Sequence, residues 1–272
     1  MIADGWAALV ASALILVGDQ GNRRVIGWLP DDPPRPGRKL HERPIPLAGV
    51  LLLPALLPWL LAGASPWLTA AVVLATLTGF VDDRGKERGS DLGWRTKAVA
   101  LAGAATLAAG AVATPWAAPG SWLAAATLVF VLTNATNFLD NTNGVAASLS
   151  AVSLFALGAD AAGWAALAFV PWNWPRPRLF LGDSGAYCLG TLVGAHAAAA
   201  APTQFAAIGV QLADFVQVVV ARCWLGVPPW VGDRRHLTHI VQNLGLPAGA
   251  VAPMFVLAAA LLALGGHLAG RP

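Results

Sequence analysis

The feature that most constrains this chain is a series of ten apolar runs separated by short polar stretches. The runs cover residues 6–18, 47–62, 67–81, 97–114, 120–139, 144–158, 160–172, 185–200, 203–222 and 248–269. Of the 272 residues, 57% are hydrophobic and only 11% are charged, whereas soluble domains average about 25% charged residues. A helix crosses a bilayer with about 20 apolar residues, and shorter runs cross when their polar flanks are also helical or when they are tilted or enclosed by protein. The sequence therefore predicts an all-α, polytopic integral membrane protein with about ten transmembrane helices in a single transmembrane domain, residues 1–272.

The basic residues predict the orientation of these helices. All but one of the 17 Lys and Arg residues lie in the stretches 19–46, 82–97, 173–184 and 222–245, and the exception is Arg271. With ten spans these stretches share one side of the membrane, which the positive-inside rule makes cytoplasmic. Both termini then lie outside, and any catalytic loops are cytoplasmic. Because the positive charge belongs to these loops, we expect no nucleic acid partner, although the net charge is +3.

A pair of carboxylates follows the third run. Asp82 and Asp83 lie at a predicted membrane interface, where two adjacent carboxylates repel each other unless a cation, a proton or a basic substrate lies between them. The alternative is a pair of solvated interfacial aspartates.

An amide-rich stretch ends the fifth run. At helical spacing Asn134, Asn137 and Asp140 are neighbours on one face, and lipid does not tolerate such a polar face. It lines a cavity, binds a ligand or forms a hydrogen-bond network between helices. The Asn143–Gly144 step predicts a turn directly after it.

A third carboxylate, Asp183, lies between Gly182 and Gly185 at the start of the eighth run, one polar loop after Asn173. Aspartate at the start of a helix is commonly an N-cap. Asp183 is therefore either a cap or a ligand, and the position of the other polar groups has to decide between these.

Two basic loops complete the polar groups. Lys39 and His41 precede the second run in a loop with five prolines from residue 33 to residue 46, which exclude a regular helix. These two residues would contact phosphate, or the loop is an ordinary positive-inside loop. The last basic loop carries Arg234, Arg235, His236 and His239, and its imidazoles at i and i+3 suit a metal or a phosphate. Asp214 is a lone acid within the ninth run, where burial is costly.

Together these groups are suited to Mg²⁺-dependent phosphoryl transfer. Mg²⁺ binds one or two carboxylates together with phosphate oxygens of the substrate, and cationic side chains neutralise the transferring group. Because the chain has no soluble domain for a protein substrate, the sequence favours a lipid as the acceptor.

The chain resembles the polyprenyl-phosphate N-acetylhexosamine-1-phosphate transferases, the family that includes the phospho-N-acetylmuramoyl-pentapeptide transferase and the undecaprenyl-phosphate N-acetylglucosamine-1-phosphate transferase. Five ordered motifs between about 31 and 245 carry the resemblance. They are Arg38-Lys39-Leu40-His41 with Pro46-Leu47-Ala48-Gly49, Gly79-Phe80-Val81-Asp82-Asp83-Arg84, Asn134-Ala135-Thr136-Asn137-Phe138-Leu139-Asp140, Phe180-Leu181-Gly182-Asp183-Ser184-Gly185 and Asp233-Arg234-Arg235-His236-Leu237-Thr238-His239.

The resemblance implies transfer of N-acetylhexosamine-1-phosphate from a UDP-sugar to polyprenyl (undecaprenyl) phosphate, with release of UMP, for cell-envelope glycan synthesis. It implies a bacterial inner (cytoplasmic) membrane location with the active site on the cytoplasmic face. The cofactor would be Mg²⁺, with Mn²⁺ as an alternative, and a homodimer stays open.

The resemblance also implies roles for individual residues. Asp183 would be the metal ligand, with Asp82, Asp83 or Asp140 as further candidates, and Asp82 and Asp83 would position or deprotonate the lipid phosphate. The catalytic set would be Asp82, Asp83, Asp183 and His236. The substrate-binding set would be Lys39, His41, Asn134, Asn137, Asp140, Asn173, Arg234, Arg235 and His239.

The chain departs from the family pattern near the substrate. Asn141 stands where Gly is usual, Thr238 stands where a further His is usual, and Ala48-Gly49 replaces a Gly pair. These changes concern sugar specificity and rate more than reaction class. The competing classes are a membrane transporter or ion path, a CDP-alcohol phosphotransferase, whose acidic cluster the stretch from Asp140 to Ala147 does not supply, and a catalytically silent family member.

Overall fold

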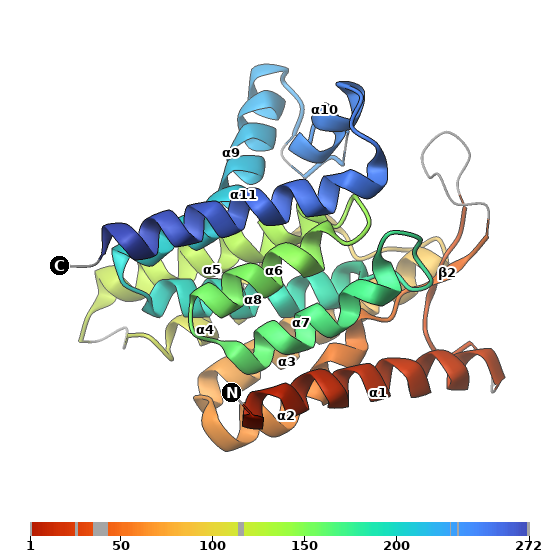
Figure 1. Ribbon diagram of the computed structural model, residues 1–272, viewed down its shortest axis with the longest axis horizontal. Helices are drawn as coiled ribbons and strands as arrows, with labels where there is room; N and C mark the ends of the chain where they lie inside the picture. Colours follow the sequence, from red (N-terminus) through yellow and green to blue (C-terminus); the bar gives the residue numbers. More distant parts are fainter. Residues whose placement is uncertain are drawn as a thin grey trace.

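The computed structural model describes residues 2–24, 27–34, 43–113, 117–228, 230–232 and 234–270. The described residues are mostly helical (Figure 1). The α-helices are α1 (Ile2–Arg24), α2 (Leu52–Gly63), α3 (Pro66–Glu87), α4 (Trp94–Ala109), α5 (Pro119–Leu139), α6 (Val145–Ala156), α7 (Asp160–Asn173), α8 (Gly182–Ala199), α9 (Gly209–Trp224), α10 (Leu237–Asn243) and α11 (Ala248–Ala269). The short elements are the 3-10 helices η1 (Gly49–Leu51) and η2 (Pro202–Ile208) and the antiparallel strands β1 (Asp31–Asp32) and β2 (Ile45–Pro46).

Every predicted apolar run forms a helix in the part of the chain described, so the all-α prediction is confirmed. Three helical stretches are long and apolar enough to cross a membrane by length and composition: Pro119–Leu139, Pro202–Trp224 and Ala248–Ala269. These stretches identify an all-α membrane protein. Ten spans and the orientation of the termini stay predictions.

Three details differ from the predicted runs. The run 97–114 ends its helix early, because Gly110 is the C-cap of α4 and turns follow it. The ninth run begins as a 3-10 helix, η2, before α9. The last basic loop contains a helix, α10, that the apolar pattern does not reveal, because this helix has only seven residues.

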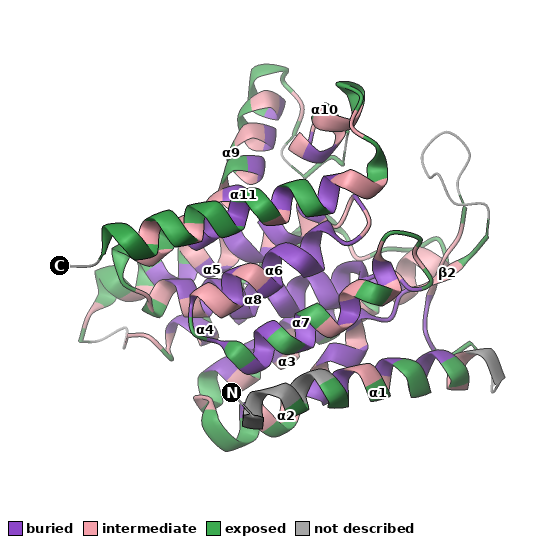
Figure 2. Cartoon of the chain, in the orientation of Figure 1, coloured by how far each residue is buried: buried purple, intermediate pink, exposed green. Residues whose placement is uncertain are grey.

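Helix α8 is the core of the bundle. Every residue from Gly182 to Ala195 is buried, and Figure 2 shows α8 enclosed by helices that expose one face. It packs against α5 and α3, while α6, α7 and α1 extend the bundle on another side. A helix that is apolar nearly all round is stable only inside a larger assembly, so α8 provides the rigid base on which Asp183 stands.

Glycines allow two other elements to approach the start of α8 closely. A Cβ added to Gly79 of α3 would lie 2.5 Å from the carbonyl carbon of Asp183, and one added to Gly49 of η1 would lie 2.5 Å from the backbone nitrogen of Gly185. Real side chains do not fit at such distances. The Gly79–Asp82–Asp83 motif and the Asp183 motif are therefore in backbone contact.

The polar turn after α5 forms as predicted. Gly144 has φ +77° and α6 begins at the next residue, which is the left-handed conformation that favours glycine. An added Cβ would also meet the side chain of Trp174 at 2.6 Å. The Asn143–Gly144 turn is thus fixed against the end of α7.

Candidate functional site

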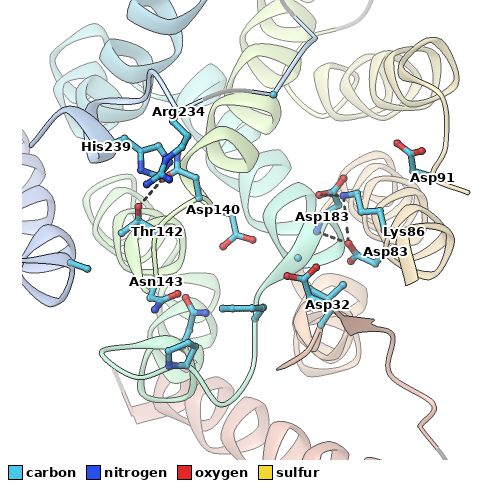
Figure 3. Close-up of a pocket in the computed structure, with 18 of the residues that line it drawn as sticks. Asp32, Asp83, Lys86, Asp91, Asp140, Thr142, Asn143, Asp183, Arg234 and His239 are labelled. Carbon is cyan, nitrogen blue, oxygen red and sulfur yellow. Dashed lines mark hydrogen bonds and ion pairs between the residues drawn. The ribbon is translucent and has the colours of Figure 1, made fainter. Parts of the chain in front are cut away.

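A cavity of about 970 Å³ lies where the ends of α3, α5, α7 and α8 meet the segment around α10. Acidic groups and Lys86 line one side, and Arg234, His239 and Thr142 lie on the other (Figure 3). The acidic residues of the lining are Asp32, Asp83, Asp91, Asp140 and Asp183. Motifs separated by more than a hundred residues therefore meet around one polar space.

Asp183 lies in the first turn of α8 and is not the N-cap of this helix. The N-cap is Leu181, which makes no side-chain capping bond. One oxygen of Asp183 accepts from Asn137 Nδ2 at 3.0 Å and lies 2.8 Å from Lys86 Nζ, and the other accepts from Tyr187 OH at 3.1 Å. The capping alternative is wrong, because the carboxylate contacts the side chains of Asn137, Lys86 and Tyr187 and not the backbone amides of its own helix.

The capping role belongs to Asp83 of α3. Its two oxygens accept the backbone N–H groups of Asp183 and Ser184, each at 3.0 Å. A carboxylate at a helix N-terminus satisfies exposed amides and interacts favourably with the helix dipole. Asp83 thereby fixes the position of the helix that carries Asp183.

Lys86 is the cation that the paired carboxylates require. Its Nζ lies 2.8 Å from Asp82 Oδ2, 2.8 Å from Asp183 Oδ1 and 4.0 Å from Asp83 Oδ1. Lys97 of α4 adds a contact of 3.2 Å to Asp82, whose other oxygen accepts Leu92 N–H at 2.8 Å. The predicted alternative of freely solvated interfacial aspartates is wrong, since both carboxylates are buried and paired.

The acids at the ends of these helices have pKa values shifted in opposite directions by their surroundings. Burial raises the pKa of Asp83 to about 7, and the charge of Asp183 adds to the effect against the opposing charge of Lys86. Burial, followed by the charges of Asp183 and Asp83, raises the pKa of Asp140 well above its ordinary value. For Asp183 burial acts in the same direction, but the charge of Lys86 and the other donors outweigh it and hold the pKa below the ordinary value. Asp183 is therefore the acid that stays ionised.

The predicted amide residues make different contacts: one binds the Asp183 carboxylate, and the others form hydrogen bonds with the backbone. Asn137 donates to Asp183, whereas Asn134 donates to the carbonyl of Phe130 on its own helix at 2.8 Å, and neither amide is among the cavity-lining residues. Asn173 lines the cavity but uses its side chain structurally, accepting Gly144 N–H at 2.6 Å and donating to Leu179 O at 3.0 Å. Asp140 lines the cavity just beyond the end of α5.

The residues of the loop that carries His236 and His239 also differ in position, since only some of them line the cavity. His239 and Arg234 line the cavity, but His236 is buried and its Nδ1 lies 2.9 Å from Asp214 Oδ2. The ring of His236 stands edge-on to Phe138, with centroids 5.5 Å apart. Arg235 is not among the cavity-lining residues.

Lys39 and His41, which the sequence predicts to contact phosphate, lie outside the described residues. Their predicted role stays a prediction. The described part of the same loop, Ile45–Pro46 with Leu47, runs beside Phe180, and Leu47 and Phe180 both line the cavity.

Sequence reasoning overlooked Lys86, Lys97 and Tyr187 as site residues. A signal existed for two of them, because Asp82–Lys86 and Asp183–Tyr187 are both at i, i+4 spacing and face each other on a helix. Lys97 could not be found this way, since its contact joins two helices.

Oxygen donors at this site fit a hard divalent cation. Among the residues that the structure describes, no group of three or more His, Cys, Asp or Glu forms a metal site by itself. Mg²⁺ needs no such cage, because it takes one or two carboxylates and completes its shell with water and substrate phosphates. Asp183, ionised and at the cavity, with Asp140 also lining it, fits that requirement.

The fold and site define an all-helical membrane protein with a charged cavity at its helix ends. The glycosyl transferase family 4 model matches residues 65–201. The chain belongs to glycosyl transferase family 4, and the resemblance drawn from the five motifs is confirmed.

Individual relatives agree with this family. The chain is 31% identical over 246 residues to a Streptomyces coelicolor protein named as a glycosyltransferase, covering 78% of this chain and 58% of the relative. It is 29% identical over 168 residues to the undecaprenyl-phosphate alpha-N-acetylglucosaminyl 1-phosphate transferase of Escherichia coli K12, covering 52% and 46%. The protein of the same name in Salmonella typhi is 26% identical over 273 residues, covering 83% and 73%. The chain spans only about half the length of the first two relatives, at 58% and 46%.

Proposed function

We propose that this protein transfers N-acetylhexosamine-1-phosphate from a UDP-sugar to a polyprenyl phosphate, forming a lipid-linked sugar diphosphate and UMP. The observation that carries the proposal is the cavity itself, where Asp183, Lys86, Arg234 and His239 converge at the ends of apolar helices. Two of the relatives described above are named for such a transfer to undecaprenyl phosphate. The family assignment leaves the transporter hypothesis without support.

The charges of the cavity suit a diphosphate. Arg234 and His239 on one wall and Lys86 on the other can neutralise phosphate oxygens, and such preorganised cations stabilise the charge that develops during phosphoryl transfer. With the first-loop residues Lys39 and His41 they form the proposed phosphate-binding set, together with Arg235.

Asp183 is the proposed ligand of Mg²⁺, or of Mn²⁺ in its place, with Asp82, Asp83 and Asp140 as further candidates. When bound, the ion would supply Lewis-acid neutralisation of the diphosphate. Asn137 and Tyr187 orient the Asp183 carboxylate through hydrogen bonds of 3.0 and 3.1 Å. Outer partners of this kind commonly fix a ligand's direction.

The reaction balances without an added base. A phosphate monoester has a second pKa of about 6, so an oxygen of the lipid phosphate is already anionic at neutral pH. This oxygen forms a bond to the β-phosphorus of the donor, and the bond from that phosphorus to the bridging oxygen breaks. UMP leaves with the electron pair. Asp83 then serves to hold α8, since both of its oxygens accept backbone N–H groups.

The location follows from the loops. We propose a bacterial inner-membrane protein with the cavity on the cytoplasmic face, because the cavity is lined by residues of the basic loops, including Lys86 and Arg234. The lipid acceptor would reach the cavity from the bilayer, and the water-soluble donor would reach it from the cytoplasm.

The test is incubation of the purified protein with UDP-N-acetylglucosamine, undecaprenyl phosphate and Mg²⁺, with release of UMP measured by chromatography. We expect UMP only when lipid, donor and divalent ion are all present, and loss of release after chelation with EDTA. UDP-N-acetylgalactosamine serves as a second donor. Absence of UMP with every UDP-N-acetylhexosamine tested would overturn the transferase proposal and favour a catalytically silent member.

A further inference from the structure

The segment 234–243 forms one wall of the cavity, and its position depends on contacts with other helices. Arg234, His239 and Gln242 from this segment line the cavity. Helix α10 has only seven residues, which is too short to be stable alone in water. Tertiary hydrogen bonds must therefore decide where Arg234 and His239 lie.

The first anchor is Asp214 of α9. This carboxylate is fully buried in α9, which belongs to a helical stretch apolar enough to cross a membrane. Its Oδ1 accepts the backbone N–H of Leu237 at 2.7 Å, and its Oδ2 lies 2.9 Å from His236 Nδ1. A buried carboxylate is costly unless its oxygens are paired, and both oxygens of Asp214 are used on the start of α10.

The second anchor joins α10 to the turn after α5. The hydroxyl of the fully buried Thr238 donates to Asn141 Oδ1 at 2.6 Å, and the same oxygen accepts the Thr142 hydroxyl at 2.8 Å. Gln242 Nε2 donates in turn to Thr142 Oγ1 at 3.3 Å. Asn141 and Thr238 therefore contact each other across 97 positions of sequence.

We propose that Asp214, Asn141 and Thr238 are positioning residues that hold Arg234 and His239 against the cavity in the arrangement needed by the donor diphosphate. Thr238 and Asn141 act as one matched unit, because the buried hydroxyl of Thr238 requires an acceptor and Asn141 supplies it. The expected effect on KM for the donor rests on the proposed function, whereas the position of α10 can be measured without any enzymatic activity.

The kinetic experiment is a double-mutant cycle on UMP release, with UDP-N-acetylglucosamine and undecaprenyl phosphate varied separately. Thr238→Val keeps the side-chain shape and removes the hydroxyl, Thr238→Ser keeps the hydroxyl, and Asn141→Ala removes the acceptor. In Thr238→Val, Asn141 Oδ1 keeps the Thr142 hydroxyl but loses the buried hydrogen bond that joins it to α10, and this loss predicts about a tenfold rise in KM for the donor. KM for the lipid should stay within about twofold, and Thr238→Ser should restore the donor KM.

The matched control is Thr136→Val. Thr136 is as buried as Thr238, and its hydroxyl makes no hydrogen bond with the residues that the structure describes. This control should leave both KM values unchanged. In the double variant the two losses should not add, because each removes the same contact. Additive effects, or a wild-type donor KM in Thr238→Val, would overturn the matched-unit proposal.

Hydrogen exchange of the backbone amides of residues 237–243 separates this inference from the proposed function. We expect exchange to accelerate about tenfold in Thr238→Val and in Asp214→Asn, with helices α5 and α8 unchanged. Asp214→Asn keeps the side-chain volume and provides a second variant if the cycle variants fold poorly. Wild-type exchange in both variants contradicts the anchoring, whereas absence of UMP from the wild-type protein contradicts only the transferase.

Discussion

At the scale of single residues, two buried carboxylates make different kinds of contact. Both oxygens of Asp83 accept backbone N–H groups of α8, whereas the oxygens of Asp183 contact the side chains of Lys86, Asn137 and Tyr187. The first arrangement stabilises a helix, while the second holds an ionised carboxylate at a cavity. A sequence motif alone cannot separate these duties, because the cap of α8 comes from α3, a hundred positions earlier.

Asp183→Asn should abolish turnover without unfolding the protein. The amide keeps the size of the side chain but removes the negative charge that faces Lys86 and the proposed cation, so UMP release should fall by at least about 100-fold. The melting temperature should shift by a few degrees at most. Asp160→Asn, at the exposed first turn of α7, is the control and should retain full activity. Activity in Asp183→Asn near the control would remove Asp183 from the mechanism.

Lys86→Met should destabilise the protein as well as inactivate it. Without this cation Asp82 and Asp183 lose a partner at 2.8 Å, and removal of one partner from a buried cluster costs several kcal/mol, reduced here to about 1–3 kcal/mol because Lys86 is one-third exposed. Lys86→Arg should recover part of the stability.

The control for Lys86 is Arg84→Met on the same turn of α3. Arg84 pairs with Glu87 at 3.2 Å near the surface, and such pairs contribute about 1 kcal/mol or less. Thermal unfolding followed by tryptophan fluorescence compares the two. Equal losses in both variants would show that Lys86 has no special role in neutralising the acids.

At the scale of elements, the buried helix α8 explains why distant motifs meet. Gly79 of α3 and Gly49 of η1 bring their backbones onto its first turn, and this places the Asp83 cap, the Asp183 carboxylate and the cavity in one rigid unit. Apolar runs predicted the helices, since hydropathy reports what is buried in lipid or protein. They could not predict α10, because Asp214, Asn141 and Thr238 fix this short helix through tertiary bonds that have no sequence period.

Gly79→Ala should separate α3 from α8. The added methyl group would lie 2.5 Å from the carbonyl carbon of Asp183, and backbone cannot yield as a flexible side chain does, so we expect a loss of about 1–3 kcal/mol. Gly103→Ala on α4 is the control, because its nearest new contact is an ordinary 3.6 Å to Leu74 Cδ2. The melting temperature should fall only in Gly79→Ala. A fall in both variants would point to a general effect of alanine.

At the scale of the whole molecule, helix length alone does not determine how many times the chain crosses the membrane. Helices α2 and α6 each have 12 residues, which is about 18 Å of helix against about 30 Å of hydrocarbon. Yet most of α6 is buried by other helices, so protein rather than lipid surrounds it. The long stretches Pro119–Leu139, Pro202–Trp224 and Ala248–Ala269 keep more exposed surface for the bilayer.

We predict ten spans and a cavity on the cytoplasmic face, and both can be tested directly by labelling residues on the two sides of the membrane. Three predicted runs, 97–114, 120–139 and 144–158, separate Ser90 from Asp160, and both residues are exposed. An odd number of crossings puts them on opposite sides. In a Cys223→Ser background, which removes the exposed native thiol, an impermeant maleimide should label Ser90→Cys only in inverted vesicles and Asp160→Cys only in right-side-out vesicles. Labelling of both from one side would mean that either one or all three of these runs do not cross. Labelling in the reverse pattern would put the cavity outside, away from any cytoplasmic UDP-sugar.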